Sequence, residues 1–206
     1  GADTMRVYEM FMGPLEASKP WSDQGVDGSR KWLERVWRLV METSEKQTDE
    51  PTPALDYSYN FTVKKVSEDY ESLNFNTAIS QMMIFINDCY KQDKINKDML
   101  IGFVRLLSPI APHICEEMWH HIGQTESVTE MSWPEFDPSA LIKDEVEIVV
   151  QINGKLKDKL SVPNNMDKAE LEKVAMDSDK VQALLEGKTV VKVVVVPNKL
   201  LNIVVK

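Results

Sequence analysis

The spacing of apolar residues changes once along this chain of 206 residues. In the first part, apolar residues recur at the spacing of one helix face; Leu33, Val36 and Val40 are an example. From Val146 onward they alternate with polar residues, which is the period of a strand with one buried face. The sequence therefore predicts an α-helical bundle followed by a small α+β domain. The predicted divisions are residues 1–28, a bundle over 29–123, a linker over 124–142 and the α+β domain over 143–206.

Two prolines interrupt the helical pattern in LLSPIAPHICEEMW, residues 106–119. Pro109 and Pro112 lack a backbone N–H and clash with the turn before them. One helix should therefore end at this point and a second should begin at Pro112. The stretch predicts a bent pair of helices within the bundle.

The same stretch contains residues that bind metals or act as nucleophiles in other proteins. His113 and His120 are seven residues apart and share a helix face, whereas Cys115 points elsewhere. A structural zinc site needs four ligands at short paired spacings, and the other cysteine, Cys89, is isolated on an apolar helix face. A cysteine nucleophile needs a base and a group that orients the base, and the spacing indicates neither. We therefore predict no metal site and no catalytic residue, and interpret the stretch as a packed helix end.

The last third of the chain predicts two hairpins around two helices. Asn153-Gly154 is the favoured turn of a two-residue hairpin, and Pro197-Asn198-Lys199 separates two runs rich in β-branched residues. Asp167 followed by Glu170 resembles a capping box, and Ser178 is placed to cap a second short helix. The predicted order is ββααββ, a four-stranded sheet with helices on one face.

Charge is divided unequally between the two parts. The chain has a net charge of −9, but residues 143–206 contain 11 Lys against 10 Asp and Glu, a net of +1, which leaves −10 for the remainder. Two basic surfaces are predicted within this acidic protein. One is on the helix over residues 29–45, where the basic residues lie opposite the apolar stripe; the other is on the second strand of the first hairpin, away from Leu156 and Leu160. Their residues are Lys31, Arg35 and Arg38 on the helix, and Lys155, Lys157 and Lys159 on the strand, with Lys199 in the opposite turn.

Composition favours a soluble, cytoplasmic protein. No apolar run is long enough to cross a membrane, and no basic region followed by an apolar run begins the chain. Two cysteines give no disulfide framework, in agreement with a reducing compartment. The chain begins at Gly1 within a predicted helix, which suggests a fragment of a longer protein.

Seven segments spread along the chain are distinctive: YEMFMGPLEASKPW, KWLERVWRLV, SLNFNTAIS, LLSPIAPHICEEMW, VTEMSWPEFD, VEIVVQINGK and VPNKLLNIVV. Together they resemble the C-terminal portion of bacterial-type leucyl-tRNA synthetases, which are class I aminoacyl-tRNA synthetases. LLSPIAPH is typical of several class I enzymes, whereas MFMGPLE and QINGK favour the leucine enzyme.

The resemblance implies a bundle of the anticodon-binding type and a C-terminal domain that docks on the corner of tRNA(Leu). It implies that residues 1–28 follow the Lys-Met-Ser-Lys-Ser loop of a catalytic domain in the same polypeptide, which uses ATP and Mg; this fragment itself needs no cofactor. His121-Ile122-Gly123-Gln124 is similar to the His-Ile-Gly-His motif, but it follows a helix rather than a strand of a nucleotide-binding fold. The expected function is therefore tRNA binding and positioning by a monomer, without catalysis.

Two other hypotheses remain open at this point. The acidic bundle could be an independent helical module that binds a protein partner. An enzyme that uses His113 and Cys115 would lose its activity on Cys115→Ser.

Overall fold

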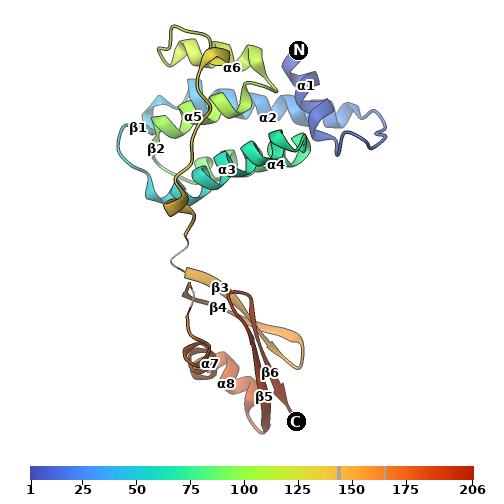
Figure 1. Ribbon diagram of the computed structural model, residues 1–206, viewed down its shortest axis with the longest axis vertical. Helices are drawn as coiled ribbons and strands as arrows, with labels where there is room; N and C mark the ends of the chain where they lie inside the picture. Colours follow the sequence, from blue (N-terminus) through green and yellow to red (C-terminus); the bar gives the residue numbers. More distant parts are fainter. Residues whose placement is uncertain (143–144, 165) are drawn as a thin grey trace. The chain divides into compact units, whose positions relative to one another are not determined.

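The computed structural model describes residues 1–142, 145–164 and 166–206. Contacts within the chain divide it into two compact units, Gly1–Leu141 and Ile142–Lys206 (Figure 1). Residue 143, the predicted start of the α+β domain, lies outside the described residues. No helix within the described ranges is both long and apolar enough to cross a membrane.

The N-terminal unit is the predicted helical bundle (Figure 1). Two strands of two residues each, β1 and β2, pair in parallel at one side of it. Its elements are α1 (Ala2–Phe11), α2 (Asp23–Met41), η1 (Ser44–Lys46), β1 (Gln47–Thr48), α3 (Pro53–Glu71), α4 (Phe75–Tyr90), β2 (Ile95–Asn96), α5 (Lys97–Leu107), α6 (Pro112–His121), η2 (Val128–Glu130) and η3 (Pro138–Leu141).

The predicted interruption between two helices is confirmed. Helix α5 ends at Leu107 and α6 begins at Pro112, where the missing proline N–H costs no helical hydrogen bond. The first turn of α6 is capped from a distant segment, because Asp3 Oδ2 of α1 accepts a hydrogen bond from Ile114 N at 2.7 Å. The proline stretch is therefore anchored to α1 as well as to α5.

The first 28 residues are part of the bundle rather than a separate segment. Val7 of α1 is fully buried in the bundle core. Helix α2 begins at Asp23, earlier than the predicted residue 29, because Ser22 Oγ accepts a hydrogen bond from Gly25 N at 3.2 Å and caps the helix. The sequence pattern missed this start because the first turn of α2 carries little apolar signal.

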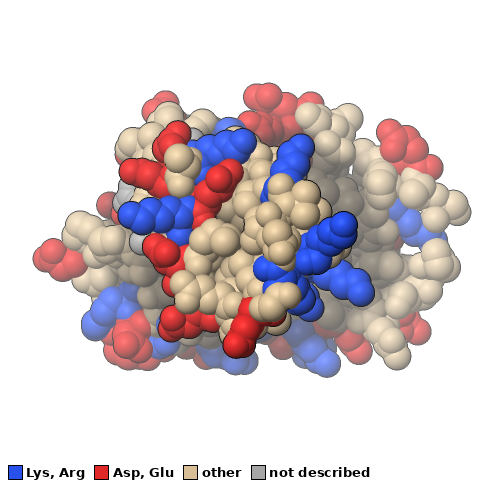
Figure 2. Space-filling model, turned by 90° about the horizontal axis from the view of Figure 1, so that it is seen from below, with Lys and Arg blue, Asp and Glu red and all other residues tan. Residues whose placement is uncertain are grey.

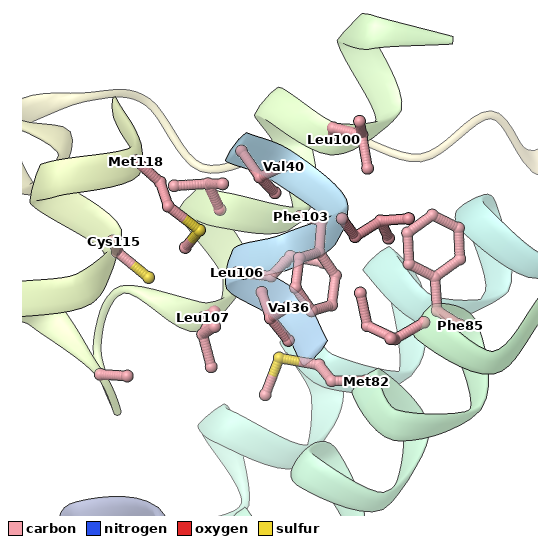
Figure 3. Close-up of a cluster of buried hydrophobic side chains, with 14 of the residues drawn as sticks. Val36, Val40, Met82, Phe85, Leu100, Phe103, Leu106, Leu107, Cys115 and Met118 are labelled. Atoms are coloured by element: carbon pink, nitrogen blue, oxygen red, sulfur yellow. The ribbon is translucent and has the colours of Figure 1, made fainter. Parts of the chain in front are cut away.

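The bundle core lies between α2, α3, α4, α5 and α6, and Figure 3 shows part of it. Phe85 of α4 and Phe103 of α5 are both fully buried, with their ring centroids 5.6 Å apart. Met82 and Met118 fill the space between helices, as the sequence predicts for unbranched side chains. Cys115 points into the same apolar cluster.

Residues 124–141 of the predicted linker, 124–142, pack on the bundle and form part of the N-terminal unit. Trp133 Nε1 donates to Ser67 Oγ of α3 at 2.7 Å, and Asp137 N donates to Asn60 Oδ1 at 2.7 Å. Val128 is buried in the core. The sequence pattern did not predict this packing, because a segment that contacts the bundle through a few separate residues has no regular spacing of apolar residues.

The C-terminal unit is a four-stranded sheet with two helices packed on one face. The sheet order is β4-β3-β6-β5; β3 and β6 are parallel, and the other neighbours are antiparallel. Its core joins Ile148, Val150 and Ile203 of the sheet to Leu171 and Val181 of the helices. The elements, in chain order, are β3 (Glu145–Ile152), β4 (Lys155–Pro163), α7 (Lys168–Asp177), α8 (Asp179–Leu185), β5 (Val190–Val196) and β6 (Leu200–Val205).

The predicted turn at Asn153-Gly154 is confirmed, with φ of 49° and 77° at the two residues. The Asn153 side chain also joins the hairpin to β6. Its Oδ1 accepts from Val205 N at 2.9 Å, and its Nδ2 donates to Val205 O at 3.1 Å. The turn residue therefore stabilises the parallel β3–β6 pair as well as its own hairpin.

Strand β4 contains a bulge that the sequence pattern did not predict. Val150 pairs with Asp158 and Gln151 pairs with Leu156, so Lys157 is an extra residue without a partner on β3. Between the bulge and the hairpin turn, each residue of β4 therefore lies on the opposite face of the sheet from the one that simple alternation predicts. Leu160 pairs with the buried Ile148, whereas Leu156 pairs with Gln151 and is 59 % exposed.

Candidate nucleic-acid interface

The prediction that Lys155, Lys157 and Lys159 share one face of β4 is wrong. Lys159 pairs with Val149 and lies on the face that carries no helix. Lys155 pairs with Ile152, which is buried on the helix-covered face, and Lys157 is the bulge residue between them. A single inserted residue thus places Lys155 and Lys159 on opposite faces of the sheet.

The lysines of the C-terminal unit also differ in their electrostatic partners. Lys159 Nζ forms an ion pair with Glu147 Oε1 at 2.7 Å, on the exposed surface of the hairpin. Neither Lys155 nor Lys157 forms an ion pair with any residue that the structure describes. These two lysines have the free charge that a phosphate would need.

Lys199 lies in the β5–β6 turn, at the other end of the β3–β6 pair from the hairpin turn. The backbone carbonyl of Lys199 accepts from Val149 N at 3.1 Å, whereas Asn153 N donates to Ile203 O at 2.9 Å. A strand rises about 3.3 Å per residue, so Lys199 and Lys155 are separated by roughly 13 Å along the strands. The four predicted lysines therefore form no single cluster.

On α2, the cations fall into two classes. Arg30 Nε contacts Glu34 Oε1 at 2.8 Å, and Arg38 Nε contacts Glu42 Oε2 at 3.9 Å. These exposed pairs are screened by solvent and contribute little to stability, but each carboxylate lowers the positive potential around its partner. The positive charge of Arg38 is thus partly compensated by Glu42.

Lys31 and Arg35 are the unpaired cations of α2: neither forms an ion pair within the described part of the chain. The Arg35 guanidinium lies over the Tyr90 ring, with Cζ 4.8 Å from the ring centroid. The Tyr90 hydroxyl donates to the Arg35 carbonyl at 2.9 Å. This contact with α4 holds the guanidinium without neutralising its charge.

The three predicted residues of α2 line two different grooves. Lys31 and Arg35 line a groove of about 390 Å³ between α2 and α4. Arg38 lines a groove of about 670 Å³ between α2, the start of α1 and the start of α6. The structure brings Lys31 and Arg35 together and places Arg38 with Glu34 on the other side of the helix.

The helical spacing did not reveal the other side chains of the groove between α2 and α4. Trp32 belongs to the apolar stripe, yet it lines this groove, as does Asn87 of α4. Gly25 and Gly28, one turn earlier on α2, also line it. These two glycines were the sequence signal that could have indicated the groove, because a glycine within a helix has no side chain and leaves space beside the helix.

Figure 2 shows the distribution of charge on one face of the molecule. Lys and Arg side chains gather on one side of an uncharged area, and Asp and Glu are interspersed with basic residues on the other. Among the described residues visible in this view, the basic side chains gather locally and do not cover the face. Contacts with a nucleic acid would therefore depend on a few local cations.

The cysteine and histidine residues of the proline stretch are not arranged as a catalytic pair. Cys115 is fully buried, and burial raises the pKa of its thiol well above the ordinary value. Burial likewise raises the pKa of Cys89 to about 12. His113 is largely exposed, and its Nδ1 lies 2.7 Å from Asp3 Oδ1. Within the described ranges, no three His, Cys, Asp or Glu side chains are grouped as metal ligands.

His121-Ile122-Gly123-Gln124 ends helix α6 and does not fit an ATP site. Gly123 has a φ of 92°, and Gly123 N donates to the His120 carbonyl at 3.0 Å. Gln124 N donates to the Trp119 carbonyl at 3.2 Å. The backbone N–H groups that would have to bind phosphate are thus used to close the helix.

Comparison with known proteins agrees with this architecture. The family model described as the anticodon-binding domain of tRNA ligase matches residues 55–174, more than half of the chain. The match begins in α3 and continues into α7, so it includes the predicted linker and the first hairpin of the C-terminal unit.

A solved structure resembles the chain over its whole length. It is the ternary complex of the Agrobacterium radiobacter K84 agnB2 LeuRS with tRNA and LeuAMS. The TM-score is 0.81 with 28 % sequence identity, and the match covers 100 % of this chain and 29 % of that one. The chain thus spans less than a third of that synthetase, and the family match shows that it belongs to the anticodon-binding domains of tRNA ligases.

Proposed function

We propose that this chain is the tRNA-binding and positioning part of a leucine–tRNA ligase. The observation that carries the proposal is the likeness of the whole chain, both units included, to a LeuRS solved with tRNA. The ligase attaches leucine to tRNA(Leu) at the expense of ATP, and the chemistry belongs to a catalytic domain of the same polypeptide. Mg and ATP are bound by that domain, and this part acts as a soluble monomer in the cytoplasm.

Local charge supports RNA contact by the N-terminal unit. Lys31 and Arg35 have no carboxylate partner among the described residues, and the two side chains border the same groove. Phosphate binding requires cations whose charge is not already compensated. We therefore assign the inner side of the tRNA to Lys31 and Arg35, with Arg38 as a weaker neighbour.

The unpaired lysines of the C-terminal unit support a second contact, at the tRNA corner. Lys155 and Lys157 lie at the hairpin end of the sheet, and Lys199 lies in the opposite turn. Lys159 contributes less because Glu147 compensates its charge. The two ends of the sheet would contact different phosphates of the RNA.

Binding of transcribed tRNA(Leu) to the 206-residue chain tests the proposal. We expect weak binding at low salt that is lost as the salt concentration rises, because the net charge of −9 leaves few cations for the phosphates. Lys157→Glu should weaken binding and leave the circular dichroism spectrum unchanged. A chain that binds no tRNA at any salt concentration, yet captures a soluble protein, would instead support the protein-interaction module.

A further inference from the structure

We propose that the groove between α2 and α4 binds one unpaired nucleotide of an RNA, with the base inside the groove and its phosphate at Lys31 and Arg35. The proposal rests on the tRNA-binding function proposed above. The function proposed above requires only that phosphates contact this surface of α2. The present proposal adds the insertion of a base into the groove.

The first observation is a buried hydrogen-bond donor without an acceptor. Trp32 lines the groove and is only 6 % exposed. Its indole Nε1 is buried and has no hydrogen-bond partner among the described residues. A buried polar group without a partner is costly and calls for an explanation. A ligand in the groove that displaced the side chains over this atom would supply the missing acceptor.

The second observation is the combination of side chains around the groove. Apolar side chains from the end of α1 and from α4 provide a surface for a planar ring, and the Asn87 amide can both donate and accept. The volume of about 390 Å³ lies within the range of about 300–1,000 Å³ typical of small-molecule sites. The lining residues are Phe11, Met12, Met83 and Asn87, with Gly25, Gly28, Ser29, Lys31, Trp32 and Arg35 of α2.

The third observation is the position of the unpaired cations on the same groove. Lys31 and Arg35 both line it, whereas the ion-paired Arg30 and Arg38 line the groove on the other side of α2. The Tyr90 ring holds the Arg35 guanidinium in place. Free charge, an unsatisfied donor and an apolar surface are therefore found together.

A nucleotide fits this combination better than an acidic peptide. An unpaired base offers a flat apolar face, acceptor atoms on its edge and a phosphate at a fixed distance from both. A carboxylate would pair with the cations but offers no flat apolar face to the apolar side chains of the groove. RNA is commonly recognised through unstacked bases that lie against aromatic or guanidinium groups.

Gly28 provides a direct way to close the groove. A Cβ added at Gly28 would meet no heavy atom within 4 Å, so a larger side chain enters open space rather than displacing the fold. Gly28→Leu should fill the groove and, because leucine favours helix, leave the thermal unfolding of the bundle undiminished. Ala54→Leu, at an exposed position in the first turn of α3, is the matched control for added apolar bulk.

The first measurement is the affinity of these variants for tRNA(Leu) and for a single-stranded RNA octamer, each compared with the octamer annealed as a duplex. We expect Gly28→Leu to weaken binding of tRNA and of the single strand by about tenfold, the usual effect of losing one stacked base. The duplex should lose little, and Ala54→Leu should match the unsubstituted chain. Equal loss for single strand and duplex would overturn base insertion and leave phosphate contact alone.

The second measurement observes the indole N–H of Trp32 by ¹⁵N NMR, with the signal assigned from Trp32→Phe. We expect the single-stranded octamer to shift this signal and an acidic peptide to leave it unmoved. Trp32→Phe removes the donor and should weaken RNA binding; because it also removes buried volume, its binding is measured at a temperature at which its circular dichroism spectrum matches that of the unsubstituted chain. A shift with the peptide and none with RNA would overturn the proposal in favour of a protein ligand.

The two proposals fail in different ways. If the chain binds tRNA and Gly28→Leu binds it equally well, the groove proposal is overturned while the tRNA-binding function stands. If neither tRNA nor the octamer binds at low salt, both are overturned. Binding of the octamer that Gly28→Leu abolishes, without binding of tRNA, supports the groove and removes tRNA as its ligand.

Discussion

The two basic surfaces of this protein, one on a helix and one on a hairpin, differ in how well the sequence predicts the positions of their residues. On α2, the helical period correctly placed Lys31, Arg35 and Arg38 away from the core, although they divide between two grooves. On β4, one extra residue moved Lys155 to the opposite face from Lys159. Helix α2 is continuous over Asp23–Met41, so its period of about 3.6 residues holds along its length, whereas one inserted residue in a strand reverses the face of every later position.

The two units should also differ in how they respond to loss of core volume. Phe103→Ala in the bundle removes a fully buried ring that packs on Phe85. We expect a loss of about 3–5 kcal/mol in the free energy of unfolding of the N-terminal unit. Denaturant unfolding followed by NMR signals from each unit measures it, with Phe103→Leu as a milder control. Equal loss in both units would show that the chain unfolds as one body.

Leu201→Ala makes the corresponding change in the sheet, where Leu201 is fully buried. Truncation of a buried leucine costs about 2–5 kcal/mol, and a unit of this size has a total stability of only about 3–5 kcal/mol. We therefore expect the C-terminal unit to be largely unfolded at 25 °C while the bundle stays folded. Hydrogen exchange resolved by unit tests this. Retained protection in β3 and β6 would contradict it.

Sequence reasoning succeeded where a local rule controls the structure. Pro112 started a helix, and Asn153-Gly154 made the turn. It failed where distant residues decide, since Ser67 and Asn60 hold the predicted linker on α3. The groove between α2 and α4 was missed for the same reason: its residues come from three helices, and no spacing along one of them brings Trp32 next to Asn87.

The hairpin turn gives a smaller test of how the sheet differs from the bundle. Asn153→Ala removes both side-chain hydrogen bonds to Val205 and places a residue with a Cβ and no polar group at a φ of 49°. We expect the C-terminal unit to lose about 1–3 kcal/mol, and the bundle to lose nothing. Thermal unfolding monitored in each unit measures the difference. Asn153→Asp, which keeps an acceptor for Val205 N, should lose less.

The smallest expected effect concerns the ion pair beside the bulge. Lys180 Nζ contacts Asp158 Oδ1 at 2.6 Å, and this hydrogen bond, assisted by the Lys159 backbone N–H, lowers the pKa of Asp158 below its ordinary 3.8. Because the pKa of Asp158 is lower in the folded chain than in the unfolded chain, the ion pair stabilises the folded state at pH values above the ordinary pKa. This stabilisation is lost as the pH falls through the pKa of the folded chain. We expect Lys180→Met to reduce the stability of the C-terminal unit slightly at pH 7 and not at pH 2. Stability curves at the two pH values measure this; an equal difference at both would contradict it.

The salt dependence of tRNA(Leu) affinity tests the central claim most directly. Each neutralised phosphate contributes about 0.7–0.9 to the slope of log affinity against log salt concentration. Replacing both Lys31 and Arg35 by alanine should lower that slope by about 1.4–1.8. Replacing the ion-paired Arg30 and Arg38 should change it less. An unchanged slope in the Lys31 and Arg35 double variant would contradict the assignment of the unpaired cations of α2 to the tRNA.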